Sequence, residues 1–322
     1  MKYFLVLNPG SKGGKSQKTF QKIFQLLMEA QINFDFGETK TLDDAYRLSV
    51  EANSSAYDVI VAVGGDGTIN KVLNGFFNQE GKRRSGAKMG VIYTGTSPDF
   101  CKSYNIPVAS VEAIKVLIND YSRPIYLGKL LCSYERIRDP EIHYVSEIDN
   151  KMIRYFACCA NIGLGATLAR KANGGIRKYL GDQMGTFVSM LSTLVSYNAN
   201  EFNISVEGVE KKIDSLYNMS IGRTKYIASG IKVPSKINFS ERGFYLLSIQ
   251  NLDVLKLIKT IRTVYGATTI QNSDYLSFSH IAELEVLNNI DNPEVEMDGD
   301  PIGFLPCCIS TSDDTLDLIV QS

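Results

Sequence analysis

The stretch that most constrains the fold runs from Asp58 to Gly75 and reads DVIVAVGGDGTINKVLNG. It opens with an apolar run, Val59 to Val63, and then becomes glycine-rich at Gly64-Gly65-Asp66-Gly67-Thr68. Further along, apolar residues recur at helical spacing, at Ile69, Val72, Leu73 and Phe76. A short β-branched run, a glycine turn and an amphipathic helix together predict a strand–loop–helix unit whose strand is buried on both faces.

The loop of this unit has the chemistry of a phosphate site. Glycines let backbone amides approach a ligand closely, and a helix N-terminus favours anions. Asp66 is the unusual residue, because phosphates repel a carboxylate unless it holds a metal ion or accepts the proton of an attacking hydroxyl. Both exceptions belong to phosphoryl transfer, so the stretch predicts that class of reaction.

Two more stretches have the same order of strand and loop. Residues 3–7 read as a strand that ends in Asn8-Pro9-Gly10-Ser11-Lys12, and residues 89–93 as one that ends in Thr94-Gly95-Thr96. Apolar periodicity also predicts a strand at 32–36 and helices at 20–30, 42–52 and 111–118. This alternation predicts a doubly wound, mostly parallel sheet, in which ligands bind beyond the carboxyl ends of the strands. We therefore expect the loops that follow these strands to lie at one edge of the sheet.

After Pro124 the pattern changes to strands with few helices. Predicted strands lie at 125–131, 152–160, 202–206, 216–221, 244–249, 275–278, 282–287 and 316–320, and predicted helices at 183–197 and 254–264. Runs of strands without alternating helices predict an antiparallel domain in the form of a β-sandwich. The fold class is therefore α/β, with a first domain at 1–124 and a second at 125–322. The last strand is a candidate to return to the first domain.

Charge and cysteine usage exclude several classes of protein. The formal net charge is −1, so no overall basicity favours nucleic acid as a partner. The six cysteines include no C-x-x-C pair, and only His143 and His280 could complete a zinc site. Adjacent cysteines inside apolar runs are typical of small buried side chains, and they favour a reducing, cytoplasmic setting.

Membrane contact, if present, is expected to be peripheral. Residues 183–200 carry no charge, but several hydroxyl and amide side chains leave the apolar positions on one face, as in an amphipathic surface helix. The basic cluster Lys82-Arg83-Arg84, with Lys88, favours a solvated loop over an anionic surface. Both segments remain candidates for docking on a membrane. An edge strand of the second domain is a candidate for pairing two subunits.

The motifs named above resemble one family when they are taken in order. Gly64-Gly65-Asp66-Gly67-Thr68, with Asn70 and Asn74-Gly75, is similar to the signature of the diacylglycerol kinase catalytic fold. The other matching stretches are Asn8-Pro9-Gly10-Ser11-Lys12-Gly13-Gly14, Gly95-Thr96-Ser97-Pro98-Asp99-Phe100 with Ile106-Pro107, Asn161-Ile162-Gly163-Leu164-Gly165, and Val295-Glu296-Met297-Asp298-Gly299-Asp300 with Pro306. The chain thus resembles the diacylglycerol kinase catalytic-domain superfamily, which also includes NAD kinases. The opening Asn-Pro loop and the late Asp-Gly-Asp favour the bacterial soluble lipid-kinase branch.

The resemblance implies ATP-dependent phosphorylation of a lipid hydroxyl, with Mg²⁺ bridging the phosphates and diacylglycerol as the expected acceptor. The residues it assigns to the nucleotide are Asn8, Pro9, Lys12, Thr39, Thr41, Gly64, Gly65, Asp66, Gly67, Thr68, Asn70, Thr94, Gly95, Thr96 and Asp300. Asp66, Asp99 and Asp300 are the candidates for holding metal. The lipid substrate would be met at a membrane surface.

Asp66 and Asp298 compete for the role of general base in this resemblance. Sphingosine-kinase-like chemistry favours Asp66, whereas the bacterial lipid-kinase pattern favours Asp298. We expect Asp298 to be the base and Asp66 to position nucleotide or Mg²⁺. The plain alternative for Asp298-Gly299 is a tight turn between strands, where Asp-Gly is common for conformational reasons alone.

Three positions depart from the family pattern. Pro98 stands where the family usually has Asn, which removes a side-chain amide and stiffens the turn. Asp300 replaces the usual Glu and shortens the reach of the charge. Glu241-Arg242-Gly243 falls where many bacterial members carry an Asp-Gly turn that holds a structural metal, so that metal is in doubt.

Other functions stay open at this level. A sphingoid base, ceramide, monoacylglycerol or phosphatidylglycerol could be the acceptor, because a lipid groove is merely apolar. An NAD kinase would share the glycine-rich loop. A nucleotide- or lipid-binding module without catalysis is favoured only by Pro98 and the altered turn at Glu241-Arg242-Gly243.

Overall fold

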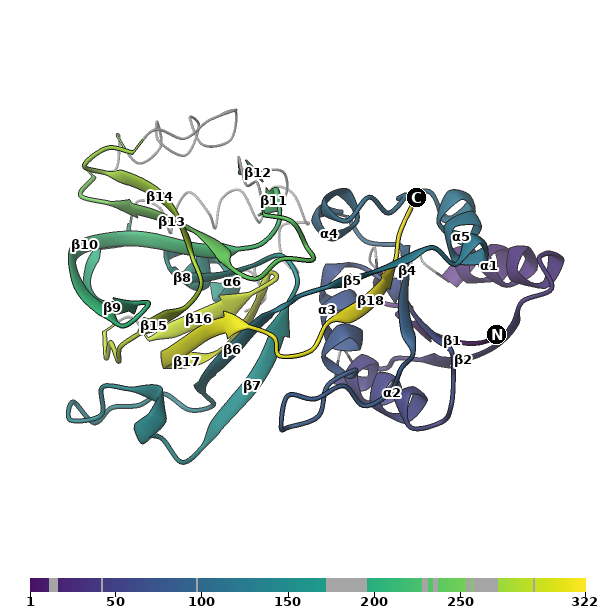
Figure 1. Cartoon of the computed structure of the whole chain (residues 1–322), viewed down its shortest axis with the longest axis horizontal. Coiled ribbons are helices and arrows are strands. Elements are labelled where there is room, and N and C mark those ends of the chain that lie inside the picture. Colours follow the sequence, from purple (N-terminus) through teal and green to yellow (C-terminus); the bar gives the residue numbers. More distant parts are fainter. Residues whose placement is uncertain are drawn as a thin grey trace.

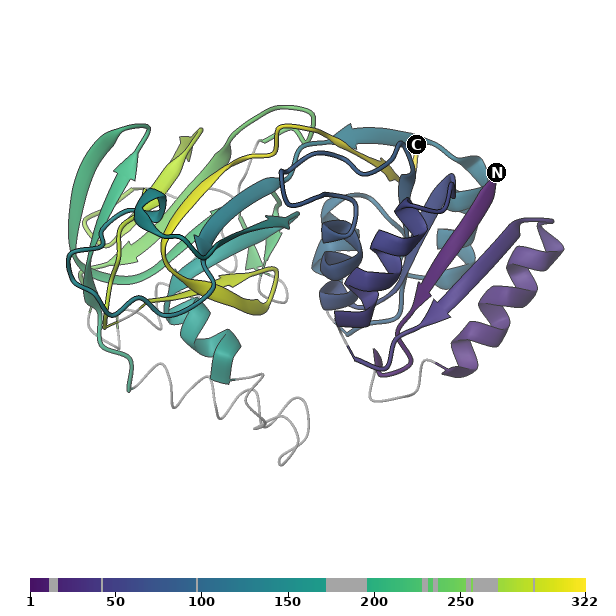
Figure 2. The ribbon, with the colours of Figure 1, turned by 90° about the horizontal axis from the view of Figure 1, so that it is seen from below.

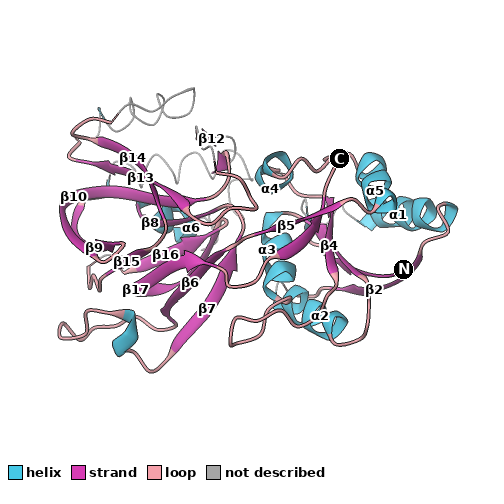
Figure 3. Ribbon diagram, in the orientation of Figure 1, coloured by secondary structure: helices cyan, strands magenta, loops and turns pink. Residues whose placement is uncertain are grey.

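The structure is a computed structural model that describes residues 1–11, 17–41, 43–96, 98–171, 196–227, 231–233, 237–252, 256, 272–291 and 293–322. In Figure 1 these residues form two large sheets side by side, the first carrying both termini on the right and the second on the left. Helices gather on the first sheet, and the rest of the chain is mostly strand (Figure 3). This division agrees with the change of pattern after Pro124 in the sequence.

The first sheet has six strands in the order β2-β1-β3-β4-β18-β5. They are β1 (Lys2–Leu7), β2 (Asn33–Glu38), β3 (Val59–Gly64), β4 (Lys88–Tyr93), β5 (Ser122–Ile125) and β18 (Leu316–Ile319). All neighbours pair in parallel except β18 and β5, which are antiparallel. The predicted doubly wound, mostly parallel sheet is therefore confirmed, and the last strand of the chain lies within it.

Helices cover both faces of this sheet, which explains why β3 is apolar at every position. The helices are α1 (Gln17–Glu29), α2 (Asp43–Asn53), α3 (Asp66–Asn74), α4 (Asp99–Ser103) and α5 (Ser110–Asn119). Val61 and its alternate neighbours pack with α1 and α5, whereas Ile60 and Ala62 pack with α2 and α3. Figure 2 shows α3 on the side of the sheet that faces the rest of the molecule.

The second sheet is antiparallel throughout and closes on itself. Its strands are β6 (Gly128–Ser133), β7 (Lys151–Phe156), β8 (Cys159–Gly163), β9 (Asn200–Val206), β10 (Val209–Gly222), β13 (Phe244–Gln250), β14 (Leu276–Ile281), β15 (Leu284–Val286), β16 (Glu294–Met297) and β17 (Asp300–Thr311). From β10 the pairing runs through β8, β16, β17, β15 and β9 and then returns to β10. The predicted antiparallel architecture is confirmed, and the pairing gives it the form of a barrel rather than two separate sheets.

The remaining described elements are a pair of short strands, one helix and the 3₁₀ helix η2 (Val145–Glu147). The short strands β11 (Tyr226–Ile227) and β12 (Ile231–Lys232) pair with each other, and the helix α6 (Leu164–Lys171) follows β8. Most of the predicted helix at 183–197, and nearly all of the one at 254–264, lies outside the described residues. Within the described part of the chain, no helix has the length and apolarity needed to cross a bilayer.

Two predicted strands are in fact divided. The expected strand at 125–131 ends at Ile125 in the first sheet and resumes at Gly128 in the second, because Tyr126 donates to the carbonyl of Phe239 and Leu127 to the hydroxyl of Ser312. The expected strand at 152–160 breaks between Phe156 and Cys159. At this break the backbone amides of residues 157–159 donate to the side chain of Asp298 instead of to a neighbouring strand. Periodicity alone missed both breaks, since the residues at the breaks, Tyr126-Leu127 and Ala157-Cys158, are themselves apolar.

The two sheets are joined by a pair of adjacent crossing segments. Residues 126–127 link β5 to β6, residues 312–315 link β17 to β18, and both run from one sheet to the other in Figure 1. The amide of Ser312 donates to the carbonyl of Leu127 at 2.9 Å, so the segments are hydrogen-bonded to each other. The division of the chain at residue 124 remains a proposal.

Candidate active site

The loops that follow β1, β3 and β4 lie together at one edge of the first sheet. The side-chain amide of Asn8 donates to the hydroxyl of Thr68 at 2.8 Å, which joins the first loop to the second. The hydroxyl of Ser11 donates to the carbonyl of Thr94 at 2.8 Å, which joins the first loop to the third. The three stretches that the sequence singled out thus form one continuous surface at the carboxyl ends of adjacent parallel strands.

Two glycines let these loops touch. A Cβ placed on Gly95 would lie 2.6 Å from the Cα of Gly65, a separation that no real side chain accepts. Helix α3 begins directly after Gly65, with no side-chain cap at its N-terminus. The first amides of a helix have no partners inside it, and the helix dipole favours an anion there. Backbone donors, close backbone approach and a hydroxyl at Thr68 are the features that a phosphate group requires, so the residues present fit a nucleotide.

Asp66 is the first residue of α3, and its carboxyl group is buried. The carboxylate accepts hydrogen bonds from the backbone amides of Asp99 and Phe100, at the start of α4. Its Oδ1 atom is buried without a partner among the described residues. Burial, together with the charges of Asp99 and Asp298, raises the pKa of Asp66 to about 8, although the two amide hydrogen bonds act in the opposite direction. A buried oxygen that lacks a donor and belongs to a perturbed carboxyl group is typical of a functional site.

Asp298 reaches the same place from the second sheet. It lies in the turn between β16 and β17, with φ of 50°, and is followed by Gly299 with φ of 93°. Its carboxylate accepts hydrogen bonds of 2.9–3.0 Å from the amides of Ala157, Cys158 and Cys159 and from the side chain of Asn70. Burial raises the pKa of Asp298, while these donors lower it. Asp298 therefore lies in a tight turn, as its sequence also allowed. The backbone of that turn directs its carboxylate toward Asn70 and the amides of residues 157–159.

Helix α3 connects the two sheets by hydrogen bonds from two asparagines one helical turn apart, Asn70 and Asn74. The amide of Asn70 donates to Asp298 at 2.9 Å and to the carbonyl of Tyr155 at 3.1 Å. Both of its hydrogens are thus engaged at the junction, and a contact of Asn70 with the nucleotide stays a prediction. Asn74 exchanges two 2.8 Å hydrogen bonds with the backbone of Tyr155, as a neighbouring strand would. The ring of Tyr155 stacks on Phe77 with centroids 4.2 Å apart.

Replacing Asn74 with alanine is expected to lower the free energy of unfolding by about 3 kcal/mol. The change leaves the buried amide of Tyr155 without an acceptor and leaves its carbonyl with only the longer hydrogen bond from Asn70. An unsatisfied buried group of this kind costs about 1–3 kcal/mol. Urea denaturation followed by circular dichroism measures the loss. Asn33→Ala, at an exposed position on β2, is the matched control and should change stability by less than about 0.5 kcal/mol. Equal effects of the two changes would contradict the role of Asn74.

The other predicted residues are placed as follows. Thr39 is buried at the end of β2, where its amide donates to the carbonyl of Leu7, and the amide of Thr41 donates to Asp44 at 2.8 Å. Pro9 and Thr96 lie on the loops that follow β1 and β4, Asp99 begins α4, and Asp300 begins β17. Lys12 lies outside the described residues.

A metal site is not evident from the protein side chains. In the described part of the chain, no three His, Cys, Asp or Glu side chains are grouped so as to hold a metal ion. Asp66, Asp99 and Asp300 therefore stay predicted ligands only. A magnesium ion that is held chiefly by nucleotide phosphates and water needs few protein ligands.

The loop at Glu241-Arg242-Gly243 does not fit the structural metal that the family resemblance raised. The guanidinium of Arg223, which is only 1% exposed, donates to the carbonyl oxygens of Glu241 and Gly243. Longer contacts of 3.5 and 3.4 Å reach the carbonyls of Asn238 and Phe239. A metal ion at this place would need the carbonyl oxygens that already accept hydrogen bonds from the Arg223 guanidinium. The positive charge of the guanidinium would also repel the ion.

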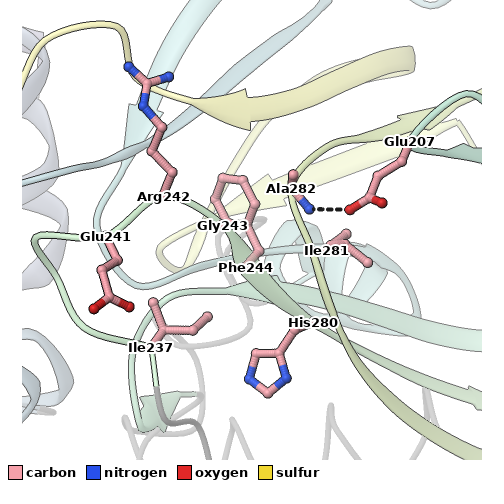
Figure 4. A pocket seen from close by; sticks show the side chains of 9 residues that line it. All are labelled: Glu207, Ile237, Glu241, Arg242, Gly243, Phe244, His280, Ile281 and Ala282. Atoms are coloured by element: carbon pink, nitrogen blue, oxygen red, sulfur yellow. Dashed lines mark hydrogen bonds between the residues drawn. The ribbon is translucent and has the colours of Figure 1, made fainter.

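Two surface features stand apart from the site. A hollow of about 330 Å³ lies beside the loop at 241–243. Its lining includes His280 and Glu207, and Glu207 accepts a hydrogen bond from the amide of Ala282 (Figure 4). No residue named above in the candidate site lines it.

In the basic cluster, Arg83 donates to the carbonyls of Thr315 and Ala87, Arg84 donates to that of Phe77, and Lys88 pairs with Asp120. These intramolecular contacts do not favour the cluster as a membrane-docking surface.

Residues that sequence reasoning missed lie mainly in the second sheet. The amides of residues 157–159 hold Asp298, and Glu296 approaches the turn from β16. Glu296 carried one usable signal, because it is a charged residue between Val295 and Met297, whose side chains enter the core. A backbone amide carries no signal in sequence, so the partners of Asp298 could not have been found there.

Comparison with known proteins agrees with this geometry. Residues 2–130 match the family model of the diacylglycerol kinase catalytic domain. Among similar curated proteins, the diacylglycerol kinase of Staphylococcus haemolyticus (strain JCSC1435) is 30% identical over 126 residues, which are 39% of this chain and 37% of that protein. That of Bacillus subtilis (strain 168) is 31% identical over 131 residues, 40% of this chain and 42% of the relative. The matched stretch therefore spans less than half the length of these relatives.

Solved structures extend the likeness of fold to the whole chain. A crystal structure of a diacylglycerol kinase from Bacillus anthracis str. Sterne has a TM-score of 0.69 at 16% identity and covers 99% of this chain and 97% of its own. Another structure from the same organism reaches a TM-score of 0.74 at 19% identity with the same coverage. The predicted fold class is confirmed, and over residues 2–130 the predicted resemblance to the diacylglycerol kinase catalytic domain is confirmed by the family model.

Proposed function

We propose that this chain, which carries a diacylglycerol kinase catalytic domain over residues 2–130, is an ATP-dependent kinase that phosphorylates a lipid hydroxyl. Diacylglycerol is the acceptor we favour, and phosphatidic acid the product. One observation carries the proposal: a carboxyl group with an unpartnered buried oxygen, Asp66, stands at the start of a helix where glycine-rich loops meet. That pairing of a phosphate cradle with a carboxylate is the requirement of phosphoryl transfer.

The division of roles follows from the contacts. Gly64 ends β3, and the backbone amides of Gly65, Gly67 and Thr68 at the start of α3 are assigned to the nucleotide phosphates. Asn8 holds the hydroxyl of Thr68 in place. ATP with Mg²⁺ would supply the phosphoryl group and neutralise its charge. As the hydroxyl oxygen bonds to phosphorus and the bond to ADP breaks, the hydroxyl proton passes to a carboxylate.

We propose Asp66 as the acceptor of that proton. The sequence pattern favoured Asp298, but the four donors on its carboxylate would have to weaken before it could take a proton. Asp66 has an oxygen with no competing donor among the described residues. Asp298 then fixes the turn and raises the pKa of Asp66 through its charge. Asp99 and Asp300 stay candidates for contact with Mg²⁺ or nucleotide.

The lipid substrate is proposed to be met at a membrane surface by peripheral contact. The segment of residues 183–200 remains the candidate for this contact, and most of it lies outside the described residues. A cytoplasmic location and a homodimer are likewise proposals that rest on the sequence.

The direct test is transfer of the γ-phosphate of radiolabelled ATP to a total lipid extract, with identification of the labelled product. We expect one labelled lipid, and diacylglycerol in mixed micelles should give phosphatidic acid. Asp66→Asn and Asp298→Asn should both lose most of this turnover. Label on NAD instead of lipid, or full turnover by both variants, would overturn the proposal. Binding of ATP without transfer to any lipid would indicate a non-catalytic module.

A further inference from the structure

A row of polar side chains crosses the barrel next to the turn that carries Asp298. Glu296 on β16 is the register partner of Asn161 on β8, which is the register partner of Ser220 on β10. The residues on either side of each of these three enter the apolar core of the barrel, so the row lies on the opposite face of the sheet. Glu296 and Ser220 are both only 4% exposed.

Hydrogen bonds make this row continuous. The amide of Asn161 donates to Oε2 of Glu296 at 2.5 Å, and the hydroxyl of Ser220 donates to Oδ1 of Asn161 at 2.5 Å. Asn218 donates to Ser220 at 3.0 Å and accepts the amide of Gly165, near the start of α6, at 2.8 Å. At the other end, Oε1 of Glu296 accepts the backbone amide of Gly299. The row therefore runs from α6 to the middle of the Asp298–Asp300 turn.

A glutamate at position 296 is unfavourable for the stability of the fold. A buried carboxyl group beside two aspartates is destabilised by burial and by repulsion, and both effects raise the pKa of Glu296 to about 8. An apolar residue would avoid this cost. Hydrogen bonds from the side chain of Asn161 and from the amide of Gly299 offset part of this cost. Of the two, the bond from Gly299 is the one that connects Glu296 to the turn.

The turn needs such a support. Asp298 has a left-handed backbone, which disfavours a residue with a Cβ, and glycine follows it with positive φ. The direction of the Asp298 carboxylate toward residues 157–159 depends on this backbone. The amide of Asp298 is held by the carbonyl of Cys159 at 2.9 Å, and that of Gly299 is held by Glu296.

We propose that Glu296 is a positioning residue for the kinase reaction: by accepting the Gly299 amide it fixes the turn and thereby the places of Asp298 and Asp300. This proposal rests on the function proposed above. It differs from a role in binding, because Glu296 is only 4% exposed and its two oxygens accept hydrogen bonds from Asn161 and Gly299. It also differs from a role in packing, because a side chain of similar size that cannot accept a hydrogen bond would not serve.

The test compares Glu296→Gln, Glu296→Leu and the control Glu294→Gln in the full chain. Glu294 lies two residues away on the same strand and pairs with Arg170 at 2.5 Å. We expect Glu296→Leu to lower kcat roughly 10- to 100-fold, the scale of a small displacement of catalytic groups, with KM for ATP changed less than about twofold. Glu296→Gln keeps an acceptor oxygen for Gly299 and should recover most of kcat. Glu294→Gln should match the wild type.

A second readout does not depend on activity. Hydrogen–deuterium exchange of peptides that span residues 294–304 should be faster in Glu296→Leu and close to wild type in Glu296→Gln. Equal kcat for the leucine and glutamine variants, or a change confined to KM, would overturn the positioning role. If the wild type phosphorylates no acceptor, the proposed function fails separately, and unchanged exchange in Glu296→Leu would overturn the contact itself.

Discussion

Replacing Asp66 with asparagine is expected to lower kcat for lipid phosphorylation by a factor of about 10² to 10⁴, the range that a positioned proton acceptor contributes. Asparagine keeps the size of the side chain and an oxygen for the amides of Asp99 and Phe100, so the loop should stay folded. It cannot accept the hydroxyl proton. Steady-state assays with diacylglycerol in mixed micelles measure kcat, and a fluorescent ATP analogue shows that the nucleotide site is intact.

If Asp66 is the proton acceptor, kcat/KM should depend on pH in a definite direction. A carboxyl group that carries a proton cannot act as a base, and burial with neighbouring charges raises the pKa of Asp66 to about 8. In the wild type, kcat/KM should therefore rise by up to about tenfold per pH unit below this pKa and level off above it. The residual activity of Asp66→Asn should lack that rise. Bound Mg²⁺ would move the inflection to lower pH by favouring the carboxylate.

The same raised pKa predicts a cost in stability. Between the ordinary pKa of an aspartate and about 8, the folded protein holds a proton on Asp66 that the unfolded chain has lost. The stabilising effect of that proton is complete at low pH and is lost as the pH rises through about 8. Asp66→Asn removes this loss, so the variant should be more stable than the wild type at pH above 8. Thermal melts at several pH values measure the difference.

The control for these measurements is Asp43→Asn, at a carboxylate whose side chain is 86% exposed and pairs with Lys71. It should leave both the pH profile and kcat unchanged. If Asp66→Asn kept wild-type kcat while Asp298→Asn lost it, the base would be Asp298, as the sequence pattern favoured. In that case the four hydrogen bonds on Asp298 would have to open during turnover.

Replacing Arg223 with methionine is expected to lower the free energy of unfolding by roughly 3 kcal/mol, because buried carbonyls lose their donor. The guanidinium is the donor that the carbonyls of Glu241 and Gly243 share, and in the described residues no carboxylate is paired with it. The loop that Arg223 holds is also bonded to one crossing segment, because the amide of Tyr126 donates to the carbonyl of Phe239. The amide of Gly243 donates to the hydroxyl of Thr311, the last residue of β17 before the other crossing segment. Loss of Arg223 should therefore loosen the junction between the sheets.

A matched control lies in the same loop. Arg242 is exposed and packs over the ring of Tyr126, so Arg242→Met removes an arginine without stranding buried carbonyls. Urea denaturation should separate the two variants clearly. Arg223→Ala adds a sharper test, because the empty space would be lined by carbonyl oxygens, which hard cations favour. Millimolar Mg²⁺ or Ca²⁺ should raise the melting temperature of Arg223→Ala and not that of the wild type. Variants at Arg223 that are as stable as the control would contradict its role.

The local pattern of apolar residues was sufficient to predict the helices and strands that follow one another directly in the chain. The apolar run at 59–63 forms β3, the apolar period after it forms α3, and the glycines between them form the loop that joins the two. The mostly parallel first sheet and the edge where its loops meet followed from the alternation of strands and helices. These features depend on periodicities of two and of 3.6 residues, which the sequence displays directly.

Tertiary structure decided which residues share the site. Asp298 meets Asn70 across 228 residues of chain, and its other partners are backbone amides. The predicted strands at 125–131 and 152–160 are divided for the same reason, since residues between the pieces bond to distant groups. The glycine-rich loop, its carboxylate and the two kinds of sheet could be predicted from the residues alone. Only the folded chain decided that Asp298 is saturated with donors while Asp66 keeps an open oxygen, because long-range hydrogen bonds leave no local period to read.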